Sequence, residues 1–204
     1  MTRLDDLTLS DLLTAIGAKT PTPGGGAVAA VVSAIAASLG QMVLRYSQGK
    51  KNLLEHDELH RSALAQLEQF GRRALDLAEA DAAAYGKLNE LWKLDKADPK
   101  RVEAWPAAVD AAINAPHQLL LTCIDMLRVI HSLAGRTNQM LDSDLAIAAV
   151  LANAGAQSAA WNVRINLPLL EDASRKASLE SDLTRMLNEA DRIRLDVERS
   201  CRTT

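Results

Sequence analysis

The sequence predicts an all-α protein, a single-domain bundle of long helices that extends over residues 1–204. Hydrophobic residues make up 48% of the chain but aromatic residues only 3%, so Ala, Leu, Ile and Val must fill the core, which suits closely packed helices. Apolar residues recur at helical spacing over long stretches. No stretch alternates apolar and polar residues as a half-buried strand does, and none resembles a linker.

The first helix is expected to begin at Thr8 or Ser10, since either side chain can cap it, and to end near Ala18. Residues 20–26, TPTPGGG, follow as a loop. The prolines disfavour helix in the residues before them, and the glycines permit positive φ and close approach by another group.

A second, buried helix should run from Gly25 to Ser47 or Gly49. Its first-turn N–H groups and positive dipole end can hold an anion or polarise a carbonyl, while a tight turn under a helix contact explains the glycines equally well. Residues 20–44 carry no charge and are long enough to cross a bilayer, but they begin with Pro and Gly and are rich in Ala and Ser. We therefore expect a buried or interface helix and no membrane partner.

The remaining helices are expected over residues 53–94, 98–134, 143–166 and 173–201. Gly71 and Gly86 are candidate break points in the first of these. Pro116 should end or kink the second, because proline cannot donate the helical hydrogen bond. Pro168 interrupts the chain before the last helix.

Residues 145–163 form a second uncharged, Ala-rich segment. Two such helices cannot both face solvent, so we expect them at the centre of the bundle or in a dimer interface. Four amides interrupt this surface: Asn153, Gln157, Asn162 and Asn166. Each is either an internal hydrogen-bond fixture or a ligand contact, and the spacing of Asn162 and Asn166 puts both on one helix face.

The formal net charge of −3 gives no reason to expect nucleic acid as a partner. Cys123 and Cys201 are the only cysteines, and the acidic, amphipathic N-terminus has no apolar signal core, so we expect a reducing, cytoplasmic setting. His56 and His60 are four residues apart but match no zinc motif. We expect them on a solvated helix face and predict no metal site.

Five blocks of the sequence occur in an order that resembles the cyclodeaminase/cyclohydrolase family, and they cover nearly the whole chain. The blocks are Pro23-Gly24-Gly25-Gly26 before the small-residue helix, Gly49-Lys50-Lys51, Ala80-Asp81-x-x-Ala84-Tyr85, Pro116 after an Ala-rich turn, and Asn138 through Ser143-Asp144 to Asn162-Val163-x-Ile165-Asn166-Leu167. This family comprises the C-terminal domain of formiminotransferase-cyclodeaminase and the related methenyltetrahydrofolate cyclohydrolases.

The resemblance implies a helical homodimer with a folate site between helices near the subunit interface, and no cofactor beyond the tetrahydrofolate substrate. The implied activity is on the N5/N10 bridge. We expect a 5,10-methenyltetrahydrofolate cyclohydrolase, because no transferase domain is attached, with formimidoyltetrahydrofolate cyclodeaminase as the alternative. Both reactions need a proton carrier and a group that favours positive charge on the amidine. A non-catalytic ligand-binding or interaction module stays open as a third interpretation.

The family's catalytic aspartate falls on Asp81, which the resemblance makes the general acid/base, with a pKa that burial can raise. From the residues alone, a solvated helix carboxylate explains Asp81 as well.

The resemblance places the other site residues in three groups. Pro23, Gly24, Gly25 and Gly26 form one wall of the folate pocket. Ser143 and Asp144 lie near the pterin, although Asp142 or Ser143 could also be a helix cap. Asn138 matches the family's loop asparagine, and Asn162 and Asn166 are further candidate contacts. Arg45, Lys50 and Lys51 are candidates for the glutamate carboxylates, unless they are solvated residues at a helix end. The sequence departs from the family pattern at Ala27, often Ser, and Thr137, usually Gly.

Overall fold

The computed structural model describes residues 3–202, and within that range it contains helices and no strand, which confirms the all-α prediction. The α-helices are α1 (Leu9–Ile16), α2 (Gly25–Arg45), α3 (Asp57–Trp92), α4 (Pro99–Leu133), α5 (Asp142–Asn166) and α6 (Ala173–Arg202). Short 3-10 helices occupy Leu4–Asp6 (η1), Lys51–His56 (η2), Gln139–Leu141 (η3) and Leu167–Leu169 (η4).

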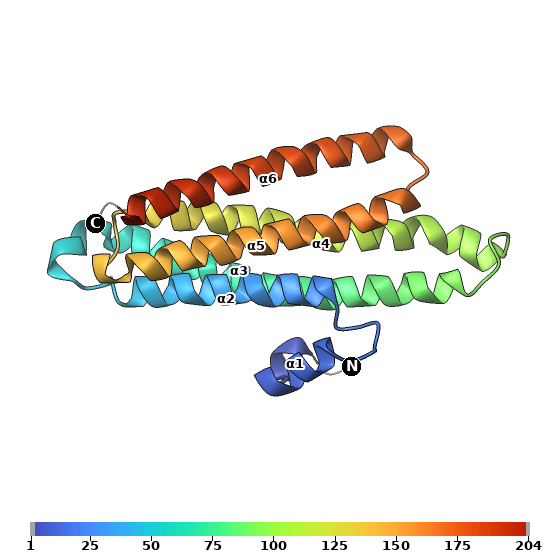
Figure 1. Ribbon diagram of the computed structural model, residues 1–204, viewed down its shortest axis with the longest axis horizontal. Coiled ribbons are helices and arrows are strands. Elements are labelled where there is room, and N and C mark those ends of the chain that lie inside the picture. Colours follow the sequence, from blue (N-terminus) through green and yellow to red (C-terminus); the bar gives the residue numbers. More distant parts are fainter. Residues whose placement is uncertain (1–2, 203–204) are drawn as a thin grey trace.

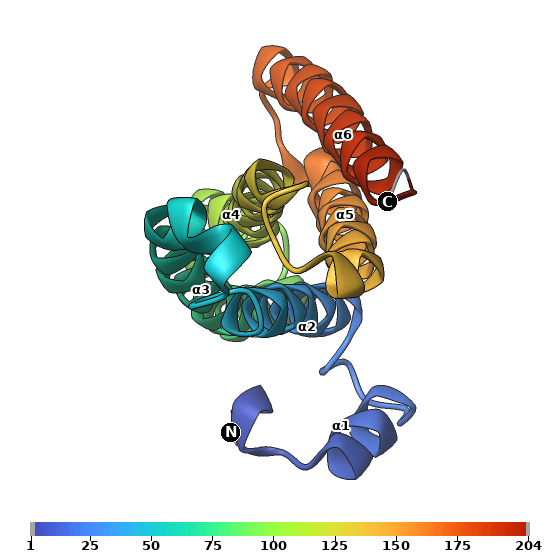
Figure 2. The same ribbon diagram turned by 90° about the vertical axis from the view of Figure 1, so that its left-hand side faces the viewer.

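Helices α2 to α5 run alternately up and down and pack in a ring, in which α2 contacts α3 and α5, and α4 contacts the same two helices (Figures 1 and 2). Helix α6 packs outside this ring, against α5 and α4. The α1 segment lies below α2 in this view, outside the ring (Figure 2). Because α2 begins at the end of the ring where α5 finishes, the glycine loop and the end of α5 are neighbours.

Helix α1 begins at the predicted cap Thr8, and α4 begins at the predicted start, where Asp98 is the cap. The Thr8 hydroxyl accepts a hydrogen bond from the main-chain N–H of Asp11 at 3.1 Å, and the Asp98 carboxylate accepts one from Lys100 N–H at 2.9 Å. The expected cap at Asp142 or Ser143 is wrong. Helix α5 already includes Asp142, and the preceding residue is Leu141, whose side chain cannot accept a hydrogen bond.

Small residues let α2 and α5 approach closely. A Cβ at Gly155 would lie 2.2 Å from the Ser33 hydroxyl oxygen, so only glycine fits there without movement. Ser33 in turn donates to the carbonyl of Ala29 at 2.7 Å, which satisfies a fully buried hydroxyl. Helix α2 is long and apolar enough to cross a membrane by length and composition, but more than half of its most apolar stretch is buried in this bundle. It packs as a core helix.

None of the residues predicted to interrupt the long helices ends one. Helix α3 continues through Gly71 and Gly86, and α4 continues through Pro116, which is buried within it. Pro116 lacks the N–H that would bond to the Ala112 carbonyl one turn earlier. The Asn166 side chain supplies the missing donor, from Nδ2 to the Ala112 oxygen at 2.9 Å. A neighbouring helix therefore compensates for the proline.

The expectation that His56 and His60 share a solvated face is wrong for His60, which is fully buried. Its Nε2 lies 2.7 Å from the main-chain oxygen of Arg136, so this nitrogen donates and the ring holds the turn after α4 against the start of α3. His56, one turn earlier in η2, is only half-buried.

Candidate active site

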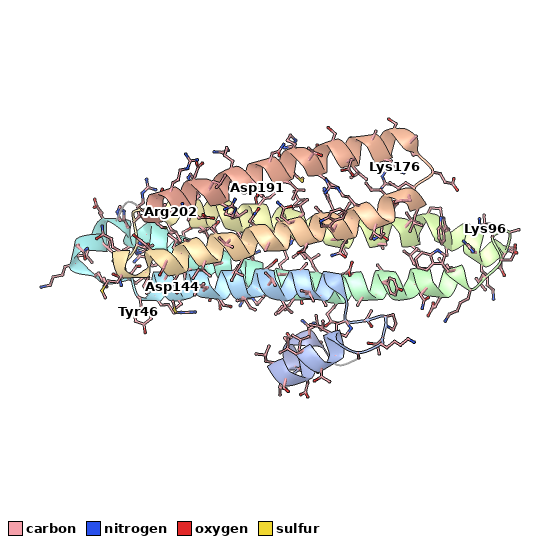
Figure 3. All side chains as sticks on the ribbon, viewed as in Figure 1. Tyr46, Lys96, Asp144, Lys176, Asp191 and Arg202 are labelled. Atoms are coloured by element: carbon pink, nitrogen blue, oxygen red, sulfur yellow. The ribbon has the colours of Figure 1, made fainter. Side chains whose placement is uncertain are left out.

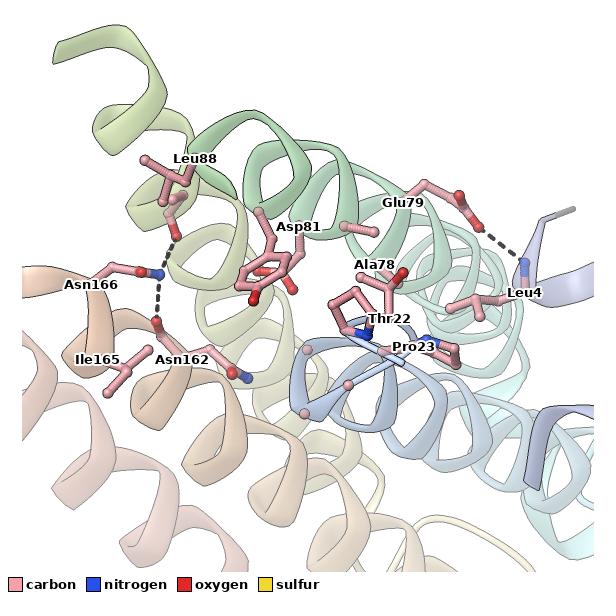
Figure 4. Close-up of a pocket in the computed structure, with 18 of the residues that line it drawn as sticks. Leu4, Thr22, Pro23, Ala78, Glu79, Asp81, Leu88, Asn162, Ile165 and Asn166 are labelled. Carbon is pink, nitrogen blue, oxygen red and sulfur yellow. Dashed lines mark hydrogen bonds between the residues drawn. The ribbon is translucent and has the colours of Figure 1, made fainter. Parts of the chain in front are cut away.

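A cavity of about 530 Å³ lies where the glycine loop, the middle of α3 and the end of α5 meet (Figure 4). The loop contributes Pro21 to Gly26, and α3 contributes a row of residues from Ala78 to Trp92. Asn162, Ile165 and Asn166 close the α5 side, and η1 covers the cavity with Leu4. The structure thus brings together the whole predicted glycine block, Asp81 and the two asparagines.

Asp81 lies directly against the first turn of α2. A Cβ at Gly26 would sit 2.0 Å from Oδ2 of Asp81, so any larger residue at position 26 would displace the carboxylate. The N-cap residue of α2 is Gly24, which has no side chain to satisfy the first-turn N–H groups. The glycines therefore serve two purposes: they make room for Asp81 and leave backbone donors at the cavity wall.

Burial raises the pKa of the Asp81 carboxyl above its ordinary value, because the apolar surroundings disfavour the charged form. Among the described residues, no hydrogen bond or ion pair reaches this carboxylate. Glu79 is the other charged residue of the described cavity wall, and its Oε1 accepts the main-chain N–H of Leu4 at 3.0 Å. The described wall holds no lysine or arginine, so the cavity suits a cationic or neutral ligand.

Asn162 and Asn166 are both internal fixtures and available acceptors. Nδ2 of Asn166 donates to the carbonyls of Ala112 at 2.9 Å and Asn162 at 3.0 Å, and Nδ2 of Asn162 donates to the Ser158 carbonyl at 3.1 Å. Within residues 3–202 no donor contacts either Oδ1. These oxygens can accept hydrogen bonds from ligand N–H groups.

The sequence interpretation missed three side chains of the α3 wall, although their spacing was a usable signal. Counting from Asp81, Tyr85, Leu88 and Trp92 follow at 4, 7 and 11 residues, which is one face of a helix. Leu4 and Leu7 of the N-terminal segment also line the cavity. No local pattern marks them, because only the fold brings this segment to α3.

The other predicted site residues lie at the opposite end of the bundle: Arg45, Lys50, Lys51, Asn138, Ser143 and Asp144. Figure 3 labels Asp144 and Tyr46 at that end and Lys96 at the other. Since α2 has 21 residues, its two ends are about 30 Å apart. Within one subunit, therefore, these residues do not contact the Asp81 cavity.

The two departures from the family pattern fall in different places. Ala27 lines the cavity beside the glycines. Thr137 is buried in the loop after α4, where the left-handed conformation is adopted by Gly135, with φ of 70°. Position 137 therefore does not require glycine in this loop.

The fold and the cavity define a class of protein: an all-helical bundle with a cavity of small-molecule size built around one partly buried carboxylate. A family profile described as formiminotransferase-cyclodeaminase matches residues 8–185, and the chain belongs to this family.

Named relatives agree with this assignment. The chain is 31% identical to formimidoyltransferase-cyclodeaminase of Gallus gallus over 186 residues. This alignment covers 89% of this chain and 34% of the relative. It is 28% identical to methenyltetrahydrofolate cyclohydrolase of Methylorubrum extorquens, with 90% of each covered. The crystal structure of formiminotetrahydrofolate cyclodeaminase from Thermotoga maritima superposes with a TM-score of 0.88 and 25% identity, over 98% of both chains. The chain spans about a third of the length of the first of these relatives.

Proposed function

We propose that this protein is a folate one-carbon enzyme acting on the N5/N10 bridge of tetrahydrofolate, as a 5,10-methenyltetrahydrofolate cyclohydrolase. The observation that carries the proposal is Asp81, a carboxylate with a raised pKa in a cavity whose described wall has no cationic residue. The methenyl bridge is a cationic amidine, so an unpaired carboxylate stabilises it and can accept a proton. The cyclohydrolase relative, which matches over nearly its whole length, supports the choice of reaction.

In the proposed reaction, water attacks the bridge carbon and passes one proton to Asp81. The bond from this carbon to N5 then breaks as the Asp81 carboxyl returns that proton to N5. The hydroxyl proton leaves to solvent, and the formyl group stays on N10. The free Oδ1 atoms of Asn162 and Asn166 are proposed acceptors for pterin N–H groups, and the first-turn N–H groups of α2 are proposed donors to ligand oxygens.

Cyclodeamination of 5-formiminotetrahydrofolate is the alternative, and the Thermotoga structure favours it. Here N10 attacks the formimino carbon and loses its proton to Asp81. The Asp81 carboxyl then gives this proton to the amino group on that carbon, and the carbon–nitrogen bond breaks to release ammonia and leave the methenyl bridge. The same residues serve both reactions because both pass through a tetrahedral carbon between nitrogens.

We also propose that the protein is a homodimer formed through the outer faces of α2 and α5. Four large apolar residues on these neighbouring helices are 37–50% exposed: Val28, Ile35, Ile147 and Val150. A two-fold axis through the middle of the α2 and α5 layer would place the far end of one subunit beside the cavity end of its partner. Asn138, Ser143 and Asp144 of the partner subunit would then approach the Asp81 cavity, which explains why the predicted site residues divide between two ends.

Absorbance of the methenyl chromophore tests the activity. Purified protein should remove this absorbance faster than buffer does, and a coupled ammonia assay with the formimino compound tests the alternative. Failure in both assays would leave only a non-catalytic, ligand-binding role.

Asp81→Asn should lower turnover by about a hundredfold or more while circular dichroism stays unchanged, because the proton carrier is lost. Glu68→Gln on the exposed face of the same helix is the matched control and should keep its turnover. Near-normal activity of Asp81→Asn would remove Asp81 from the mechanism.

A further inference from the structure

A second cavity, of about 640 Å³, lies beyond the far end of the first, between the start of α4, the segment after η4 and the start of α6. We propose that it binds the glutamate tail of a folate whose pterin lies at Asp81. This inference rests on the proposed function and deepens it, because it assigns the γ-glutamyl carboxylates to residues outside the reaction site.

The two cavities share a wall and are connected by aromatic side chains. Leu169 of η4 lines both. Trp92 of the first cavity contacts Trp105 of the second, with ring centroids 6.4 Å apart and an edge-to-face angle of 63°. Tyr85 contacts Trp92 in turn, also at 6.4 Å. A p-aminobenzoyl ring leaving the first cavity would therefore meet aromatic and apolar surface.

Arg101 presents its positive charge in the second cavity without an acidic partner. Its guanidinium stacks over the Trp105 ring at 4.8 Å, and Nη1 donates to the Leu94 carbonyl at 2.8 Å. These two contacts fix its position, and among the described residues no carboxylate pairs with it. Lys96 also lines this cavity and forms no ion pair within the same range. The preorganised guanidinium is suited to a carboxylate ligand.

Two acidic residues of this cavity are already occupied. Asp110 pairs with Arg175 at 2.7 Å. Asp172 caps α6 by accepting the main-chain N–H of Ser174 at 2.9 Å. Glu171 is the remaining acidic residue, so the charges without a partner in the described cavity are two positive and one negative.

The distances favour the later glutamates of a long tail. Asp81 and Trp92 are 11 residues apart on one helix, which corresponds to about 16 Å. Arg101 and Lys96 lie beyond Trp92, so an oligo-γ-glutamyl tail reaches them more readily than a single glutamate does. Within one subunit, the predicted tail residues Lys50 and Lys51 lie at the opposite end, so the titration below compares them directly with Arg101.

Calorimetric titration with p-aminobenzoyl-triglutamate tests the inference without any pterin chemistry. Wild-type protein should bind this fragment, and Arg101→Gln should weaken binding by about tenfold through loss of a charge-assisted contact. Arg72→Gln, an exposed arginine of α3 outside the linings of both cavities, is the charge-matched control and should change binding by less than about twofold. The inference is overturned if wild-type protein does not bind the fragment, if Arg101→Gln binds normally, or if Lys50→Gln and Lys51→Gln abolish binding instead.

A turnover assay separates this inference from the proposed function. With methenyl substrates, Arg101→Gln should raise KM for the triglutamate form and leave kcat unchanged, with a smaller effect on the monoglutamate form. If wild-type protein turns over neither substrate, the proposed function fails, while the fragment titration still decides whether the second cavity binds a glutamate tail.

Discussion

The side chain of Asn166 donates a hydrogen bond to the main-chain oxygen of Ala112, 54 residues earlier in the chain, at 2.9 Å. This oxygen lacks its usual helical donor because position 116 is proline. Asn166 and Ala112 both line the Asp81 cavity, so the contact fixes α5 against α4 at the cavity wall. A helix-breaking residue in one helix and an amide in another thus form one structural unit.

Asn166→Ala should destabilise the protein by about 1–3 kcal/mol, because it leaves the partly enclosed Ala112 carbonyl without a donor. Pro116→Ala restores a backbone N–H to that carbonyl. In the Pro116→Ala background, the cost of Asn166→Ala should therefore be smaller, and a double-mutant cycle from urea unfolding measures the difference. Additive effects of the two substitutions would show that Asn166 and Pro116 are not coupled.

Gly26→Ala should reduce kcat by about a hundredfold, since the new methyl group would lie 2.0 Å from Asp81 Oδ2 and must displace it. Gly86→Ala is the control, on the same helix as Asp81 but with open space around the new methyl group. It should keep its activity and stabilise the helix by about 0.5–1 kcal/mol. Equal activities for the two variants would contradict a close approach of α2 to Asp81.

Stability should depend on pH through Asp81. Burial raises the pKa of this carboxyl in the folded state, so the folded protein keeps a proton that the unfolded chain has released. Between the ordinary and the raised pKa, stability therefore falls as pH rises. Asp81→Asn removes this cost and should increase the melting temperature at pH 7 to 8, with the gain disappearing below about pH 4. A gain that persists at low pH would indicate a different cause.

Helix positions, the cap at Thr8 and the helix start at Asp98 were predictable because they depend on local features, such as apolar spacing and a capping residue before a helix. The continuity of α4 through Pro116 could not be predicted, because the missing hydrogen bond is supplied by Asn166, which is distant in sequence. The burial of His60 likewise depends on Arg136, 76 residues away. Spacing of residues four apart cannot distinguish a solvated helix face from one that a loop covers.

The candidate cavity could be predicted from the sequence only where motifs mark its lining residues. The glycine block, Asp81 and the asparagines of α5 meet in one cavity, as the resemblance implied for a pocket between helices. Glu79 and Leu4 join the wall through a contact between η1 and α3, for which the sequence holds no local signal. The remaining motif residues, such as Lys50 and Asp144, lie at the far end of the bundle. Only the fold shows this, because the order of motifs along the chain does not give the distances between them.

The proposed dimer should dissociate when charge is placed on its apolar face. Ile35→Asp on α2 and Ile147→Asp on α5 each replace a large exposed apolar side chain with a carboxylate. Burying that carboxylate in the interface would remove its hydration, and this cost would oppose association. Sedimentation or light scattering should show a shift from dimer to monomer at micromolar concentration. Turnover should fall as well, because Ser143 and Asp144 of the partner subunit would no longer reach the cavity. Leu195→Asp on the exposed side of α6 is the matched control, and it should remain dimeric and active. If all three variants sediment as the wild type does, the α2 and α5 face is not the interface.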